Sequence, residues 1–157
     1  MERFPKFQES IDHNVIVLVA VAVVQNGKVL MINEEDRPYY HQWILPQGYP
    51  KRNETLADAA IREVREELGI NIDILGLVGI YDDFAKEGDA TLHYVIVCYL
   101  GQPSGDAQIH TTAEVIDWAW RDPADEFVDA MPIMQKILKD VAAIKPGRYP
   151  FSRMKVK

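Results

Sequence analysis

Three glutamates near the middle of the chain have the spacing of a cation-binding face. Glu63, Glu66 and Glu67 stand at positions i, i+3 and i+4, and an α-helix brings such positions onto one side. Like charges placed this way destabilise a helix by about 0.2–0.5 kcal/mol per pair. A divalent cation would offset that repulsion, because carboxylate oxygens are ligands that Mg²⁺ prefers. The trio therefore predicts a site for a hard divalent cation such as Mg²⁺.

A longer pattern surrounds these glutamates between residues 48 and 70. Gly48 is followed after five residues by Glu54, and after seven more by the run Arg62-Glu63-Val64-Arg65-Glu66-Glu67-Leu68-Gly69-Ile70. The stretch resembles the Nudix box, Gly-x5-Glu-x7-Arg-Glu-(aliphatic)-x-Glu-Glu-x-Gly-(aliphatic), and all nine specified positions are met. Nine positions at fixed spacing are far more specific than a lone glycine motif. The resemblance implies a hydrolase that cleaves a pyrophosphate bond in nucleoside diphosphate-linked compounds.

The resemblance also implies roles for the box residues. Glu63 and Glu67 are the leading cation ligands, and Glu66 is a ligand or the general base. The backbone carbonyl of Gly48 is a further ligand in many members of the family, and a glycine lets the backbone approach an ion closely. Arg62 is expected to pair with a box carboxylate and to fix the ligand face. Because Arg62 and Glu66 are also four residues apart, a plain surface salt bridge is the alternative.

Residues outside the box complete the predicted site. Many family members carry an acidic residue near Glu114 that binds another metal ion or acts as the base, although a solvated loop glutamate is the alternative. Two further groups are candidates for substrate binding, and each of these side chains alone is more often solvated or packed. The candidates for contact with the phosphates are the cations Arg37, Lys51 and Arg52. The candidates for stacking on a nucleobase are Tyr81 and Phe84.

The hydrophobic pattern predicts the elements that position these residues. Residues 55–68 form a predicted helix whose apolar stripe lies on a different face from the glutamates. An Asn-Gly pair at 26–27 predicts a hairpin turn. The remaining predicted elements are strands at 15–24, 29–32, 72–81, 91–100 and 114–120, an acidic loop at 82–89, a helical turn at 125–128 and a helix at 131–144. Together they predict an α/β (α+β) fold, for which the resemblance implies a mixed β-sheet sandwiched between helices.

Composition restricts the class of protein. The length of 157 residues, 48% of them hydrophobic, predicts a single soluble domain over residues 1–157. A cytoplasmic location is expected, because the sequence contains no membrane-spanning apolar run, no signal-peptide pattern and only one cysteine. The net charge of −7 argues against general nucleic-acid binding. A basic tail at residues 145–157 either steers an anionic substrate or is a solvated terminus.

The box specifies the bond that is cleaved and leaves the attached group open. ADP-ribose pyrophosphatases often carry a proline about fifteen residues beyond the box, where this chain has Ala85. The tyrosine that dinucleoside polyphosphate hydrolases carry in this region is also absent. Residues 46–48 resemble part of the Pro-Gln-Gly-Gly segment of dinucleoside polyphosphate and RNA 5′-end hydrolases, whereas residues 79–83 resemble nucleoside-diphosphate-sugar members. ADP-ribose or a nucleotide sugar is slightly favoured, and dinucleoside polyphosphates and nucleoside triphosphates follow.

Two other functions are compatible with a fold of this family. A nucleotide-sensing domain without turnover, with a regulatory role, would be expected to lose box glutamates, and none is lost here. An isomerase acting on an isoprenoid diphosphate needs a catalytic cysteine, whereas Cys98 lies in the middle of a predicted strand. Homodimers are common among nucleotide-sugar members, so a homodimer is a further expectation that the sequence leaves open.

Overall fold

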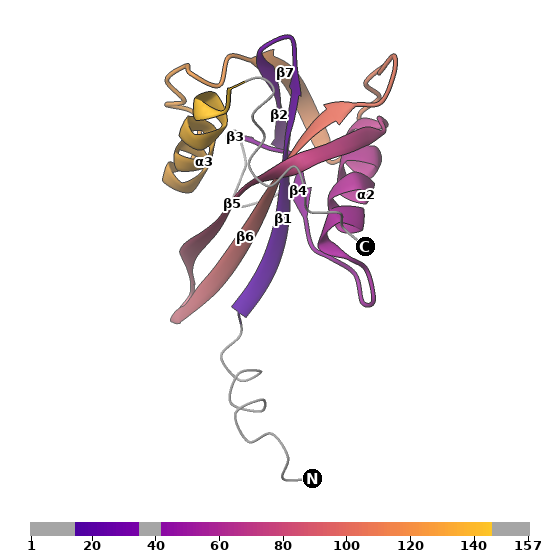
Figure 1. Cartoon of the computed structure of the whole chain (residues 1–157). Coiled ribbons are helices and arrows are strands. Elements are labelled where there is room, and N and C mark those ends of the chain that lie inside the picture. The colour runs from indigo at the N-terminus through magenta and orange to yellow at the C-terminus, as the bar shows by residue number, and fades with distance from the viewer. Residues whose placement is uncertain (1–14, 35–41, 146–157) are drawn as a thin grey trace.

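The described residues fold into strands with one helix among them and a second helix after the last strand (Figure 1). The computed structural model describes residues 15–34 and 42–145. In chain order, its elements are β1 (Val15–Gln25), β2 (Lys28–Glu34), β3 (Trp43–Ile44), β4 (Gln47–Gly48), α2 (Leu56–Leu68), β5 (Ile72–Glu87), β6 (Ala90–Pro103), β7 (Val115–Arg121) and α3 (Pro132–Ala143). Neither helix of this described part is long and apolar enough to cross a membrane.

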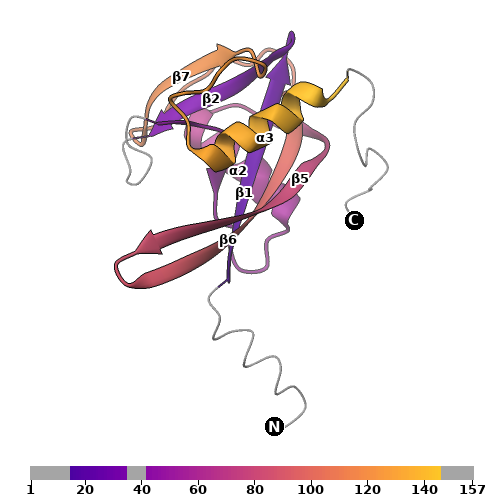
Figure 2. The same ribbon diagram turned by 90° about the vertical axis from the view of Figure 1, so that its left-hand side faces the viewer.

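The strands form one mixed sheet between the two helices. Its order is β3-β2-β1-β6-β5, while β4 pairs with β1 and β7 pairs with β2. Only the β1–β6 pairing is parallel among the described strands. Figure 2 shows α3 in front of the sheet and α2 behind it. The predicted mixed sheet sandwiched between helices is therefore confirmed.

Strand β1 forms the centre of the core. Its residues 18–23 are all buried, because α2 covers one face of the sheet and α3 the other, and a strand covered on both faces has a continuous apolar run. The turn that follows contains Asn26 with φ of 51° and Gly27 with φ of 74°. Positive φ at both central residues belongs to the tight turn that matches the twist of a hairpin, so the predicted hairpin turn is confirmed.

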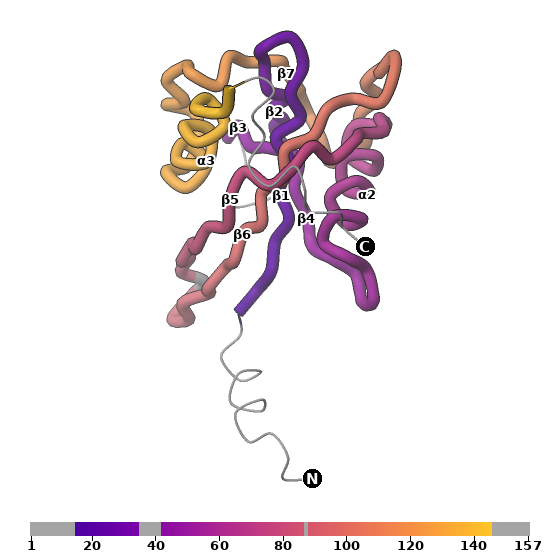
Figure 3. The backbone as a smooth tube through the Cα atoms, viewed as in Figure 1, coloured from indigo at the N-terminus to yellow at the C-terminus, as the bar shows by residue number. Residues whose placement is uncertain are grey.

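The predicted acidic loop at residues 82–89 is wrong. Strand β5 continues to Glu87, and β6 starts at Ala90 after a two-residue turn in which Gly88 has φ of 61°. The resulting long hairpin projects at the lower left of Figure 3. Charged residues fit this part of the strand because the hairpin is exposed there; Asp82, for example, pairs with His93 of β6 at 2.7 Å. The polar residues at 82–89 therefore indicated correctly that the segment is exposed, but the loop predicted from them is a strand hairpin.

The predicted helical turn at residues 125–128 is also absent, since the segment contains bends and turns instead. Phe127 is buried here, and the guanidinium of Arg121 lies 4.4 Å from the centre of its ring. Arg121 also donates to the carboxylate of Asp129 at 3.0 Å. The anchoring of Phe127 and this ion pair shape the connection between β7 and α3 in place of helical hydrogen bonds.

Candidate functional site

Helix α2 is the element that carries the three glutamates, and local signals define both of its ends. The hydroxyl of Thr55 accepts a hydrogen bond from the backbone N–H of Asp58 at 3.1 Å, which caps the first turn. Gly69 follows the helix with φ of 68°, and its N–H donates to the carbonyl of Arg65 at 2.9 Å. A left-handed residue at this place is a common helix stop, and it favours glycine. The residues that begin and end α2, Thr55 and Gly69, therefore both lie within the box.

The three glutamates of α2 differ strongly in exposure. The side chain of Glu66 is 53% exposed and that of Glu63 is 14% exposed, while Glu67 is only 6% exposed. The apolar residues of the helix pack against the sheet, among them Val64 and Leu68. Glu67 lies next to this apolar stripe, and Glu66 lies farthest from it. The common face predicted from the spacing therefore extends from the protein interior to the solvent.

Strand β4 brings Gly48 directly under the carboxylate of Glu63. Gly48 pairs with Val19 of β1, which fixes its position in the sheet. A Cβ atom added at Gly48 would lie 2.1 Å from Cδ of Glu63 and 2.3 Å from each carboxylate oxygen. Any side chain at this position would collide with Glu63, so the carboxylate of Glu63 occupies the space that the glycine leaves open.

Arg62 connects the box carboxylates to one another. Its guanidinium donates to both oxygens of Glu54, at 2.6 and 3.0 Å, and to the carbonyl of Tyr49 at 2.9 Å. The same group donates to Glu63 at 2.7 Å and to Glu66 at 3.0 Å. The predicted pairing of Arg62 with box carboxylates is therefore present. It is more than the surface salt bridge of the alternative interpretation, because the guanidinium and Glu54 are largely buried.

The charges of this network stabilise each other. The hydrogen bond from Arg62 lowers the pKa of Glu54 to about 2, and the same contact raises the pKa of Arg62. Burial raises the pKa of Glu63, and the hydrogen bond from Arg62 acts in the opposite direction. Glu54 and Arg62 are thus held as a charged pair, and Glu63 lies between this pair and the sheet.

Glu67 meets a carboxylate from outside the box. Burial raises the pKa of Glu67, and the neighbouring carboxyl of Glu34, at the end of β2, raises it further. The backbone N–H of Gln47 donates to Glu67 and acts in the opposite direction. Atom Oε2 of Glu67 is buried without a hydrogen-bond partner. Glu34 is a site residue that the sequence analysis missed, because it lies two residues beyond the predicted strand at 29–32.

The donor set fits a hard divalent cation. Within residues 15–34 and 42–145, no three acidic, histidine or cysteine side chains already stand at the spacing of a metal centre. However, Glu67 presents a buried oxygen without a partner, which is costly unless something binds it. The carboxylate of Glu63 lies against the backbone of Gly48, whose carbonyl oxygen is a further ligand of the predicted site. Carboxylate and carbonyl oxygens are the ligands of Mg²⁺ and Mn²⁺.

Comparison with known proteins identifies the family. The NUDIX domain profile matches residues 14–141. The chain belongs to the NUDIX domain family. A MutT-like protein of Streptomyces ambofaciens is 31% identical over 119 residues, which cover 76% of this chain and 70% of that protein.

Several relatives of this NUDIX domain carry more specific names. The 8-oxo-dGDP phosphatase of Danio rerio is 34% identical over 66% of this chain and 30% of its own length. A low-salt glycan biosynthesis protein of Haloferax volcanii is 33% identical over 58% of this chain and 62% of its own length. The chain therefore spans less than two thirds of these relatives.

Solved structures share the fold of the NUDIX domain. A MutT NUDIX hydrolase from Burkholderia pseudomallei has a TM-score of 0.70 at 25% identity, over 81% of this chain and 98% of that chain. A NUDIX hydrolase from Nitrosomonas europaea has the same TM-score and identity, over 90% of this chain and 97% of that chain. The sheet and helices described above are thus those of Nudix hydrolases.

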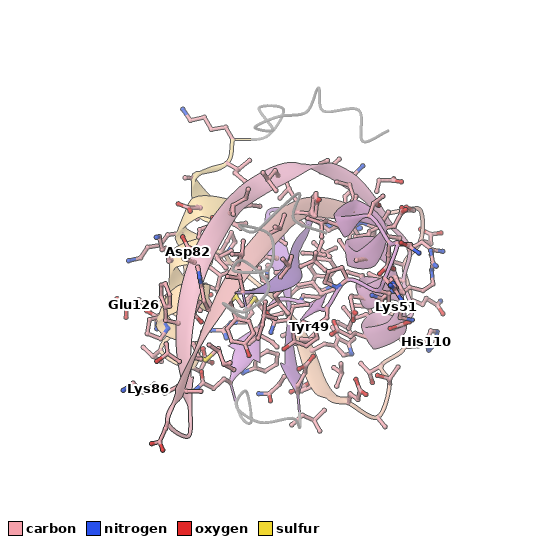
Figure 4. All side chains as sticks on the ribbon, turned by 90° about the horizontal axis from the view of Figure 1, so that it is seen from below. Tyr49, Lys51, Asp82, Lys86, His110 and Glu126 are labelled. Carbon is pink, nitrogen blue, oxygen red and sulfur yellow. The ribbon has the colours of Figure 1, made fainter. Side chains whose placement is uncertain are left out.

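The remaining charged residues predicted for the site of this NUDIX domain lie around its rim. Lys51 is exposed, with Nζ 3.8 Å from Oε1 of Glu66, and Arg52 is exposed in the same loop. Glu114 is exposed just before β7, two residues after Thr112, whose N–H approaches the carbonyl of Glu67 at 3.4 Å. Figure 4 shows Lys51 beside α2 and Glu126 on the opposite side of the molecule. Arg37 and most of the basic tail lie outside the described residues.

The two predicted aromatic contacts of the NUDIX domain have different positions. Tyr81 is buried, and its hydroxyl donates to Asp140 of α3 at 2.6 Å; burial and this carboxylate raise its pKa. Tyr81 therefore links β5 to α3, and its base-stacking role stays a prediction. Phe84 is 64% exposed and stacks on His93 with ring centres 4.5 Å apart. Its role in substrate binding stays a prediction.

Proposed function

We propose that this protein is a hydrolase dependent on Mg²⁺ or Mn²⁺ that cleaves the pyrophosphate bond of a nucleoside diphosphate-linked substrate. The observation that carries the proposal is the arrangement of Glu63 and Glu67. One carboxylate lies against the backbone of Gly48, and the other is buried with an oxygen that has no partner. A helix that only needed to be soluble would keep these carboxylates in water.

Different residues of the chain would hold the cation, position the carboxylates and accept the proton. When bound, a divalent cation neutralises the phosphate oxygens and favours attack by water. Glu63 and Glu67 would hold it, with the carbonyl of Gly48 beside them, and Arg62 would keep Glu63 and Glu66 in place through its hydrogen bonds. Water forms a bond to one phosphorus while the bridging P–O bond breaks and its electron pair stays with the leaving phosphate.

The proton that the water loses needs an acceptor near the solvent. Glu66 is the most exposed of the three glutamates, and it belongs to the same helical face, so it suits the role of base. Glu114 is the alternative base, since its segment adjoins the end of α2. The products are two phosphorylated compounds, or orthophosphate and a shortened nucleotide when a terminal phosphate leaves.

ADP-ribose or a nucleotide sugar is the substrate class that we place first. Residues 79–83 support it by their resemblance to nucleoside-diphosphate-sugar members. A relative described as an ADP-ribose pyrophosphatase of Methanocaldococcus jannaschii, 26% identical over 54% of this chain, also supports it. The 8-oxo-dGDP phosphatase of Danio rerio, which is 34% identical, supports oxidised nucleotides as the second class. The cytoplasmic location, a homodimer and an RNA 5′ end as substrate stay predictions from the sequence.

The isomerase alternative is weakened by the position of its required nucleophile. Cys98 is buried within β6, and burial raises the pKa of its thiol to about 12. A thiol with that pKa stays protonated at neutral pH and is a poor nucleophile. A hydrolase is the better account of the site.

The deciding experiment measures phosphate release from a panel of substrates. ADP-ribose, nucleotide sugars, dinucleoside polyphosphates and oxidised nucleoside di- and triphosphates are each tested with Mg²⁺ or Mn²⁺, with and without added phosphatase. One substrate turned over well above the others, and only with the cation, supports the proposal and names the class. Uniformly negligible rates together with measurable nucleotide binding would favour the nucleotide-sensing domain.

A further inference from the structure

The end of strand β2 is irregular at the point where it reaches the site. β2 pairs with β7 in regular register from Val29 to Asn33, and the register shifts between Asn33 and Glu34, so that Glu34 pairs with Val115. A bulge of this kind redirects the side chain that follows it, and bulges are frequent next to active sites. Here that side chain is the carboxylate of Glu34, which reaches Glu67 of the box from the end of β2.

Glu34 and Glu67 form a carboxyl–carboxyl contact in the protein interior. The two side chains share a hydrogen bond, and Glu67 is 6% exposed. A divalent cation bound between two neighbouring carboxylates would offset their mutual repulsion. Oε2 of Glu67 is buried without a hydrogen-bond partner. A cation would bind both carboxylates and would also satisfy this oxygen.

We propose that Glu34 is a cation ligand from outside the box, which joins Glu67 in holding Mg²⁺ or Mn²⁺. The inference rests on the proposed function, because it uses the same Glu67. It adds a ligand from β2 to those from α2, so that the cation ties the end of the sheet to the helix.

The test measures Mn²⁺ binding to the full-length protein without substrate, by electron paramagnetic resonance of the free ion. Glu34→Gln keeps the size of the side chain and can still hydrogen-bond to Glu67, but it removes the charge. Glu34→Asp keeps the charge and withdraws the carboxylate by one methylene. Glu126→Gln is the matched control, because it removes an exposed charge on the opposite side of the molecule from Lys51 (Figure 4).

The ligand role predicts that both Glu34 variants bind Mn²⁺ at least about tenfold more weakly, the lower end of the loss expected when a partner of a metal site is removed, while the control binds like the wild type. Wild-type affinity in Glu34→Gln overturns the proposal. So does weak binding in Glu34→Gln with wild-type affinity in Glu34→Asp, because that result assigns only a long-range charge effect to Glu34.

Two controls separate this inference from the function on which it rests. Circular dichroism and urea unfolding in EDTA establish that each variant is folded. If Glu34→Gln does not fold, the Mn²⁺ affinity of Glu34→Asp decides the test. A wild-type protein that binds no Mn²⁺ and turns over no substrate contradicts the proposed function and the inference together. A wild-type protein that does both, with Glu34 variants that bind Mn²⁺ normally, contradicts the inference alone.

Discussion

Replacing Gly48 by alanine tests whether the backbone of β4 positions Glu63. The added Cβ would lie 2.1 Å from Cδ of Glu63, whereas ordinary contacts begin at 3.4 Å. The carboxylate must therefore withdraw by ~1.3 Å. A misplacement of about 1 Å in a catalytic group can reduce the rate about 10²-fold, which corresponds to about 2.7 kcal/mol of transition-state stabilisation. We expect Gly48→Ala to lower kcat/KM by that factor and to weaken Mn²⁺ binding.

The same substitution should leave the fold nearly unchanged. The atoms that the Cβ meets belong to the end of a flexible side chain, which can rotate away. The φ of Gly48 is outside the left-handed region, so alanine introduces no backbone strain and reduces the entropy of the unfolded chain. The free energy of unfolding, measured in urea and EDTA, should change by no more than about 1 kcal/mol.

Gly101→Ala is the matched control for this experiment. Gly101 also lies in a strand and has no positive φ, but the nearest atom to its added Cβ is Cδ1 of Ile72 at 3.2 Å, remote from the carboxylates. It should lose some stability and keep its activity. The reasoning is refuted if folded Gly48→Ala retains wild-type kcat/KM and Mn²⁺ affinity, or if Gly101→Ala loses as much activity as Gly48→Ala.

Three further changes probe other parts of the site. Glu67→Gln should reduce kcat by orders of magnitude in saturating Mg²⁺ and leave the circular dichroism spectrum unchanged, because it removes a ligand. Arg62→Lys should raise the pKa of Glu54 from about 2 toward the ordinary value of 4.5 for a glutamate, as carboxylate NMR titration would measure. Since the folded pKa of Glu54 is the lower one, its contribution to stability is complete above about pH 4.5 and is lost as the pH falls to 2, so the variant should lose less stability over that window. Tyr81→Phe should cost about 1–3 kcal/mol in urea unfolding, because it leaves the Asp140 carboxylate without the hydroxyl, and should keep kcat.

Each of these changes has an outcome that contradicts its reasoning. A Glu67→Gln variant with near wild-type turnover would remove Glu67 from the ligands. A pKa of Glu54 that stays near 2 in Arg62→Lys would mean that another group holds its charge. Loss of turnover without loss of stability in Tyr81→Phe would contradict the structural role and support the prediction that Tyr81 contacts the substrate.

The sequence alone determined the parts of the site that depend on local spacing. The positions of Glu63, Glu66 and Glu67 along one helix follow from 3.6 residues per turn, and the ends of that helix follow from Thr55 and Gly69. These are interactions between residues a few positions apart, so the chain needs no distant partner to specify them. The contact of Arg62 with Glu66, four residues away, was predictable for the same reason, whereas its wider pairing with box carboxylates was implied by the family resemblance.

Only the tertiary structure decided how deeply each carboxylate is buried and what it meets. Glu34 reaches Glu67 because β2 lies beside β1, β1 pairs with β4, and α2 packs on the same sheet. Tyr81 is buried because α3 covers its face of β5, although two aspartates follow it directly in the sequence. Sheet pairing joins residues that are far apart in the chain, and the spacing of residues along one segment carries no record of which strand or helix will lie beside it.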